Sequence, residues 1–149
     1  MKLLVDTNVV LRAAQASHPH HEEAKAALES LLAGANEVCI VPQVLHETWA
    51  VATRPAEQNG MGLTTKDAAA LITRIRATFV IFEDPAGFID RWQQVVTEYE
   101  AKGKSSHDAR LVAAMQAHGI DYVLTFNTQD FQRYRGLTTI SPRAVTNNS

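Results

Sequence analysis

Four acidic residues occupy positions from which they could act together on a phosphate or a cation. Asp6 directly follows the apolar run at 3–5, where a buried strand is expected to end. Glu47 lies about one and a half turns into a predicted helix. Asp108 falls in the first turn of a later predicted helix, and Asp130 lies just beyond the fourth predicted strand. Because functional residues of open α/β sheets gather at the carboxyl ends of the strands, we expect all four at that edge.

Each of these residues also has an ordinary explanation when it is taken alone. The helix dipole favours an aspartate near a helix N-terminus, such as Asp108, and aspartates such as Asp130 are common in turns. Glu47 could be a solvated helix residue, although Leu45 and Trp49 beside it indicate a mostly packed helix. Taken singly, only Asp6 favours a functional role.

The four residues together favour a metal site. Converging carboxylates without a cation would repel one another, raise their pKa values and destabilise the fold, whereas a divalent metal would neutralise them. Mg²⁺ and Mn²⁺ prefer oxygen ligands and keep several waters, which suits carboxylates together with a phosphate-bearing substrate. The pattern therefore predicts cation-assisted chemistry on a phosphate.

Apolar strands that alternate with helices must position these residues. Strands are predicted at 3–5, 37–41, 80–84, 122–126 and 137–141. Helices are predicted from about 24 to 33, at 43–54, at 66–79, from 88 to about 101, and at 107–118. Gly34 and Gly119 are expected to end the first and the last of these, and Pro42 fits the first turn of the second. Thr64 and Thr65 are the expected caps of the third helix, and Ser105 or Ser106 is the expected cap of the last. Continuous Leu, Val and Ile strands between helices are typical of a parallel sheet covered on both faces, so the fold class is α/β.

Composition is that of one globular domain. The chain has 149 residues, 46% of them hydrophobic, and a net charge of −2, which does not support constitutive, high-affinity binding of nucleic acid by electrostatics alone. We expect a single domain at 1–144 with a short polar tail at 145–149, no export signal or membrane span, and a cytoplasmic location. The single Cys39 lies in an apolar run and is predicted to be a buried, inert thiol.

Four segments resemble the PIN domain family, in particular the VapC-type toxins of toxin–antitoxin pairs. They are LLVDTNVVL at the N-terminus, VPQVLHETWAVATRP, SSHDARLVAAMQAHG and VLTFNTQDF, so the resemblance extends over essentially the whole chain. It implies a three-layer α/β/α sandwich with a central parallel sheet and a metal-dependent endoribonuclease that cleaves RNA phosphodiesters. It also implies an antitoxin partner and a homodimer.

The resemblance assigns roles to individual positions. Asp6 and Asp108 are expected to bind Mg²⁺ or Mn²⁺ directly, and Glu47 is expected to bind the metal or to act as general base on the attacking water. Asn8 and Thr125 are expected to orient carboxylates or water. The fourth acidic position stays open, because many PIN sequences have an aspartate where this chain has Asn127, and Asp130 could supply the charge instead.

Basic residues near the acidic segments are candidate phosphate contacts. These are Arg12, Lys102, Lys104 and Arg110, although lysines and arginines in such places are usually just solvated. His18, His20 and His21 have no cysteine partners and no zinc-site spacing, so a solvated start of a helix is the preferred interpretation.

Other protein classes also place an aspartate after the first strand. Haloacid-dehalogenase phosphatases need a second aspartate where this chain has Asn8, and response-regulator receivers need an acidic pair before the strand and a late lysine; neither pattern is present. A catalytically weak PIN-like module that binds RNA or protein is the more serious alternative. Only an assay of turnover separates it from a nuclease.

Overall fold

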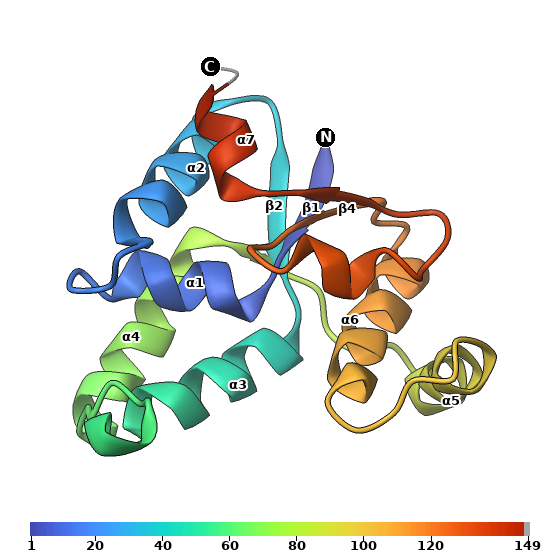
Figure 1. Cartoon of the computed structure of the whole chain (residues 1–149), viewed down its shortest axis with the longest axis horizontal. Coiled ribbons are helices and arrows are strands. Elements are labelled where there is room, and N and C mark those ends of the chain that lie inside the picture. The colour runs from blue at the N-terminus through green and yellow to red at the C-terminus, as the bar shows by residue number, and fades with distance from the viewer. Residues whose placement is uncertain (148–149) are drawn as a thin grey trace.

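The computed structural model describes residues 1–147, whose strands form one parallel five-stranded sheet (Figure 1). The strands are β1 (Lys2–Val5), β2 (Glu37–Ile40), β3 (Val80–Ile81), β4 (Tyr122–Leu124) and β5 (Thr138–Ile140). Their order in the sheet is β3-β2-β1-β4-β5, and every neighbouring pair is parallel. The predicted α/β class with a central parallel sheet is confirmed.

Helices cover both faces of this sheet. They are α1 (Thr7–Ala14), α2 (His21–Ala33), α3 (Pro42–Thr53), α4 (Thr65–Thr78), α5 (Phe88–Glu98), α6 (Ser105–His118) and α7 (Pro142–Asn147), with short 3₁₀ turns η1 (Ala56–Gln58) and η2 (Thr128–Phe131). In Figure 1, α5 and α6 lie on one side of the strands and the other five helices lie on the opposite side. The result is the expected three-layer α/β/α sandwich.

The first strand occupies the centre of the sheet. Leu4 is in register with Cys39 of β2 on one side and with Val123 of β4 on the other. Strand order reverses at β1, since the chain proceeds outward to β2 and β3 and later returns to β4 and β5. In open α/β sheets such a reversal creates a crevice at the carboxyl ends of the strands, and Asp6 stands at that point.

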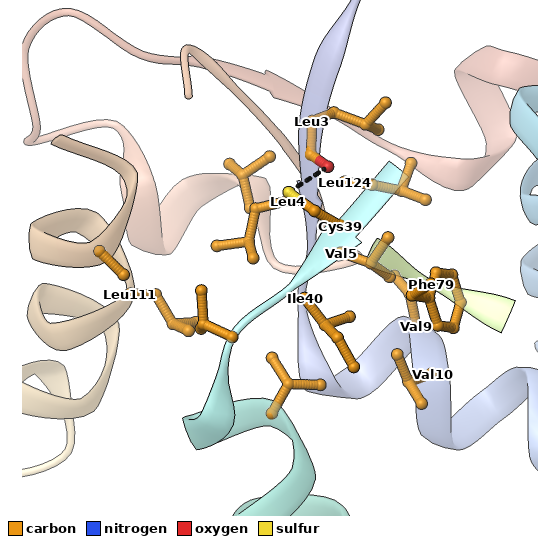
Figure 2. Close-up of a cluster of buried hydrophobic side chains, with 14 of the residues drawn as sticks. Leu3, Leu4, Val5, Val9, Val10, Cys39, Ile40, Phe79, Leu111 and Leu124 are labelled. Carbon is orange, nitrogen blue, oxygen red and sulfur yellow. Dashed lines mark hydrogen bonds between the residues drawn. The ribbon is translucent and has the colours of Figure 1, made fainter. Parts of the chain in front are cut away.

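The core forms on both faces of the central strands (Figure 2). Leu111 of α6 lies on one side, and Val9, Val10 and Phe79 lie on the other. Both faces of a central strand are therefore apolar, which explains why β1 is a continuous run of Leu and Val rather than an alternating pattern.

The thiol of Cys39 is buried in this core. It donates a weak hydrogen bond to the Leu3 carbonyl at 3.1 Å, drawn as a dashed line in Figure 2. Burial, with a smaller contribution from Glu37, raises the pKa of the Cys39 thiol to about 12. The prediction of a buried, inert cysteine is confirmed.

Two helices were not predicted from the sequence. Helix α1 begins directly after β1, so Thr7 and Asn8 lie in its first turn rather than in a loop. Helix α7 covers 142–147 and packs against α2, so the tail expected at 145–149 is helical as far as Asn147; positions 148–149 lie outside the described residues.

Several predicted boundaries need correction, while two helix ends are confirmed. The third strand is only Val80–Ile81, α5 ends at Glu98, and α6 starts at Ser105, so neither Ser105 nor Ser106 caps it. Thr64 caps α4 by accepting a hydrogen bond from the Asp67 amide at 3.1 Å, and Gly119 ends α6 in the left-handed conformation.

Within residues 1–147, no helix combines the length and the apolar character that crossing a membrane would require.

Candidate active site

Asp6 is held at the junction of β1 and α1 by three hydrogen bonds. Its Oδ1 accepts from the Thr7 amide at 2.7 Å, so that it caps α1. Its Oδ2 accepts from the Thr125 hydroxyl at 2.7 Å and from the Asn8 side-chain amide at 3.4 Å. Only 7% of Asp6 is exposed. The carboxylate is therefore buried and fixed in orientation by the first turn of α1 and by Thr125, which follows β4.

Asn8 and Thr125 belong to one hydrogen-bond network around Asp6. The Asn8 amide group lies 3.3 Å from Thr125 Oγ1, and Asn8 Oδ1 accepts from the Phe126 backbone amide at 3.3 Å. The Asn127 backbone amide donates to Thr125 Oγ1 at 3.0 Å. This geometry supports the predicted orienting role of Asn8 and Thr125, whereas Asn127 takes part here through its backbone, and its side chain is exposed.

Glu47 is joined to the same turn of α1. Its Oε1 accepts a hydrogen bond from the Thr7 hydroxyl at 3.0 Å. Thr7 is buried, and Glu47 is half-buried on α3. The Thr7 backbone thus binds Asp6 while its side chain binds Glu47, which fixes two of the predicted carboxylates relative to each other.

Asp108 lies in the first turn of α6, which a side chain from α3 ties to the site. The Gln43 amide group donates to the His107 carbonyl at 2.9 Å, and Gln43 is buried. Gln43 lies one helical turn before Glu47 on α3. This bond therefore sets the distance between the helix that carries Glu47 and the helix that carries Asp108.

The electrostatics show that the four acidic residues form one group. Burial raises the pKa of Asp6 to about 6, against the lowering effect of its hydrogen bonds and with further increases from Glu47 and Asp130. Burial also raises the pKa of Asp108 to about 7, with additional contributions from Asp6, Asp130 and Glu47. Residues separated by about a hundred positions in the sequence thus influence one another's protonation.

Asp130 adds a negative charge that acts on both Asp6 and Asp108. This residue lies in η2, is exposed, and raises the pKa of both Asp6 and Asp108. Asn127, the alternative, carries no charge and could offer only an amide oxygen.

The donor chemistry of this group fits a divalent cation. Its carboxylate oxygens are the ligands that Mg²⁺ and Mn²⁺ prefer, and a cation would relieve the repulsion among the neighbouring carboxylates. Within residues 1–147, no group of three or more Asp, Glu, His or Cys side chains lies close enough together to hold a metal ion. An open arrangement with few protein ligands is the usual form of a Mg²⁺ site, because this ion keeps several waters.

The basic residues predicted to contact phosphate occupy different surroundings. Arg110 forms an ion pair with Asp84 at 3.1 Å, so it is engaged away from the four carboxylates. Lys104 is exposed just before α6, and Lys102 lines a surface hollow beside Arg133. Arg12 lines a cavity that is also lined by Asn8.

Sequence reasoning missed three residues of this site. Gln43 makes the bond described above, the Arg133 charge lowers the pKa of Asp108, and the Tyr134 hydroxyl is buried without a partner among the described residues. Thr7 drew attention in the sequence because it stands between Asp6 and Asn8, but its bond to Glu47 was not predicted. The roles of the three missed residues depend on contacts between distant segments, for which the sequence offers no signal.

A comparison with known families decides the classification of this fold and site. The sequence profile of the PIN domain matches residues 3–137, which is most of the chain. The chain belongs to the PIN domain family. The α/β/α sandwich described above is the PIN fold.

Relatives with names and solved structures extend this comparison. The chain is 27% identical to Ribonuclease VapC48 of Mycobacterium tuberculosis over 139 residues, which cover 92% of this chain and 94% of that protein. The fold is similar to a crystal structure of VapBC2 from Rickettsia felis bound to a DNA fragment from its promoter, with a TM-score of 0.72, 18% identity and coverage of 95% and 98%. It is also similar to M. tuberculosis VapC20, described as a sarcin–ricin loop cleaving toxin, with a TM-score of 0.62, 20% identity and coverage of 81% and 86%.

Proposed function

We propose that this PIN domain is a metal-dependent endoribonuclease and the toxin of a type II toxin–antitoxin pair. The observation that carries the proposal is the group of four carboxylates at the carboxyl end of β1, with the pKa values of Asp6 and Asp108 raised by burial and by the other acidic residues. Keeping several carboxylates in partly buried positions costs stability, and a cation-binding function explains why the fold tolerates this cost. The name of the VapC48 relative supports RNA as the substrate.

The chain would hold Mg²⁺ or Mn²⁺ through Asp6 and Asp108, with Glu47 as a further ligand or as a base. Such a cation lowers the pKa of water and stabilises negative charge on a phosphodiester under attack. Asp6 is suited to a fixed ligand because the Thr7 amide and the Thr125 hydroxyl hold its two oxygens in place. Asp130 adds negative charge at the exposed rim of the site.

Glu47 is suited to accept a proton from the attacking water. The Thr7 hydroxyl binds its Oε1 and leaves the other carboxylate oxygen for water. Glu47 is half-buried, so water can reach it while the neighbouring α1 and α3 restrict its orientation. Its link to Asp6, through their shared contacts with Thr7, supports the role of a general base.

The same proposal includes the partners and the cellular context. A toxin–antitoxin complex from Klebsiella pneumoniae is among the structures similar to this fold, which supports an antitoxin as the partner of this chain. The family resemblance supports a homodimer. RNA as the substrate and the single buried cysteine are consistent with action in the cytoplasm.

The decisive experiment is a cleavage assay on total RNA with mapped ends, in Mg²⁺, in Mn²⁺ and in excess chelator. We expect cleavage with either metal and none in chelator. Asp6→Asn and Asp108→Asn should abolish cleavage while circular dichroism shows a folded protein, because asparagine keeps the size of the side chain and removes its charge. Cleavage that persists in chelator or in both variants would refute the metal-dependent mechanism.

A catalytically weak binding module is the alternative. It would use the acidic group to bind basic side chains of a partner without turnover. Growth arrest on expression, which is lost in Asp108→Asn and suppressed by a co-expressed neighbouring small reading frame, would support the toxin. Binding of such a partner with no RNA cleavage under any metal condition would support the module.

A further inference from the structure

The cavity lined by Arg12 is a hollow that adjoins the acidic site on the side of α1, α2 and α7. Its volume is about 590 Å³. Basic, aromatic and amide side chains dominate its lining: Arg12, His18, His20, Phe126, Asn127 and Arg143. This composition contrasts with the four carboxylates next to it, and nothing in the mechanism above uses it.

The hollow is continuous with the hydrogen-bond network around Asp6. Asn8 lines it, and the amide group of Asn8 lies 3.4 Å from Asp6 Oδ2. The Asn8 side-chain oxygen in turn accepts from the Phe126 backbone amide at 3.3 Å. An RNA chain that places a phosphodiester beside Asp6 would therefore place an adjoining nucleotide at this hollow.

Aromatic rings form one wall of the hollow. The His20 and Phe126 rings lie 5.2 Å apart between centroids at 33°, and His18 lies 5.5 Å from His20. Phe126 is half-buried and packs against the core, whereas His20 is exposed. His20 is therefore exposed to solvent, as predicted, but its ring also packs against Phe126. Its ring and that of Phe126 offer a face on which a nucleobase can stack.

Two arginines supply positive charge at the same place. Burial lowers the pKa of His18, and the charges of Arg12 and His20 lower it further. Arg12 therefore lies close enough to these rings to influence the protonation of His18. Arg143 of α7 pairs with Glu23 at 3.1 Å, and His20 Nδ1 lies 3.7 Å from the same carboxylate. With two arginines and one glutamate, the lining carries a net positive charge. Guanidinium groups are well suited to phosphate oxygens.

We propose that this hollow binds one unpaired nucleotide of an RNA substrate, next to the phosphodiester at the acidic site. The base would stack on Phe126 and His20, and the flanking phosphate would contact Arg12 and Arg143. The inference rests on the proposed function and adds to it a binding position for the nucleotide beside the cleaved phosphodiester. An acidic protein segment would pair with the arginines but would leave the aromatic wall unused, so the combination favours a nucleotide.

Binding of a fluorescein-labelled, unstructured RNA oligonucleotide, followed by anisotropy, tests the arginines. The parent for these measurements is full-length Asp108→Asn protein in Mg²⁺, which should not cleave the probe. We expect Arg12→Gln and Arg143→Gln each to weaken binding about threefold to tenfold and to reduce the slope of log affinity against log salt by about 0.7. Arg74→Gln, which removes the same charge from an exposed position on α4, is the matched control and should leave binding unchanged.

Two further variants separate stacking and charge from loss of folding. Phe126→Leu keeps an apolar side chain and should weaken binding about fivefold or more, because it removes the stacking surface. Glu23→Gln removes the negative charge from the lining and should tighten binding. Because Glu23→Gln also removes the ion pair between α2 and α7, any loss of stability would weaken binding, so tighter binding cannot be explained by a less stable fold.

The outcomes distinguish this inference from the proposed function. If the wild-type chain cleaves RNA but the Arg12, Arg143 and Phe126 variants bind the probe as tightly as the Arg74→Gln control, the nucleotide site is refuted and the ribonuclease remains. If the parent binds a polyglutamate peptide through the two arginines and does not bind RNA, the hollow is a protein site and the inference fails. If binding depends on the hollow but the wild-type chain shows no cleavage in either metal, the nucleotide site stands and the proposed ribonuclease does not.

Discussion

The Thr7 hydroxyl donates a hydrogen bond to Glu47 Oε1 across 3.0 Å and thereby joins the first turn of α1 to α3. The Thr7 backbone amide binds Asp6 at the same time. One residue therefore fixes a predicted metal ligand through its main chain and a predicted base through its side chain. These two functions can be separated by mutation.

Thr7→Val should reduce kcat for RNA cleavage about fivefold with little change in KM. Valine has nearly the same shape but lacks the hydroxyl, so Glu47 loses an orienting bond worth about 1 kcal/mol while the amide bond to Asp6 remains. Thr7→Ser restores the hydroxyl and should restore most of the activity. Equal kcat values for the valine variant and the wild type would show that Glu47 needs no orientation by Thr7.

The stability of the metal-free protein should fall as the pH rises from about 4 to about 7. Asp6 and Asp108 have folded-state pKa values of about 6 and about 7, both above the ordinary value of 3.8. In this range the folded state binds more protons than the unfolded state, so deprotonation lowers the free energy of unfolding. Urea denaturation in chelator at several pH values measures the slope.

Asp108→Asn provides the matched control for this pH dependence. Removing the charge should make the metal-free protein about 2 kcal/mol more stable at pH 8, a value reduced for solvent screening of this half-buried group, and should flatten the decline in stability. Glu29→Gln, which removes an exposed carboxylate from α2, should change neither the stability at pH 8 nor its dependence on pH. A wild-type protein whose stability increases between pH 5 and 7 in chelator would contradict the raised pKa values.

Mg²⁺ or Mn²⁺ should raise the melting temperature more at pH 8 than at pH 5.5. Metal ligands must be deprotonated, and Asp6 and Asp108 are largely protonated at the lower pH. At a metal concentration about one hundred times the Kd, the expected stabilisation is about 2.7 kcal/mol. Differential scanning fluorimetry measures it, and Asp6→Asn should abolish the increment. An equal increment in wild type and Asp6→Asn would place the cation elsewhere.

Gln43→Met should lower activity and stability together. Methionine has a similar volume but cannot donate to the His107 carbonyl, so the start of α6 loses its link to α3. The lost hydrogen bond is worth about 0.5–1.5 kcal/mol. Thermal unfolding and kcat check the result, with Gln93→Met on the exposed face of α5 as the control. Full activity in Gln43→Met would show that Asp108 is positioned without this bond.

The sheet was predictable because its strands are short apolar runs between helices with clear ends. Helix α1 was not predictable in the same way, because Val9 and Val10 are β-branched and continue the apolar pattern of β1. Their helical conformation depends on burial of both side chains in the core and on the Asp6 cap. Tertiary packing overrides local propensity at this position.

The acidic residues of the site were predictable from their places at strand ends and helix starts, and their identities matched a known family. Their supports were less accessible to sequence reasoning. The bond between Gln43 and His107, the charge of Arg133 beside Asp108 and the stacking of His20 on Phe126 each join segments that are distant in sequence. Only the folded chain shows which of many polar residues become neighbours.

The bond between Asp6 and Thr125 spans 119 positions of the chain. During synthesis, Asp6 emerges from the ribosome near the beginning and Thr125 near the end. Asp6, which follows β1, therefore lacks the hydrogen bond from Thr125 until β4 and the residue after it have been synthesised. A chain that stops before β4 lacks Thr125 and Asp130, so we expect prematurely terminated products to be harmless to the cell that makes them.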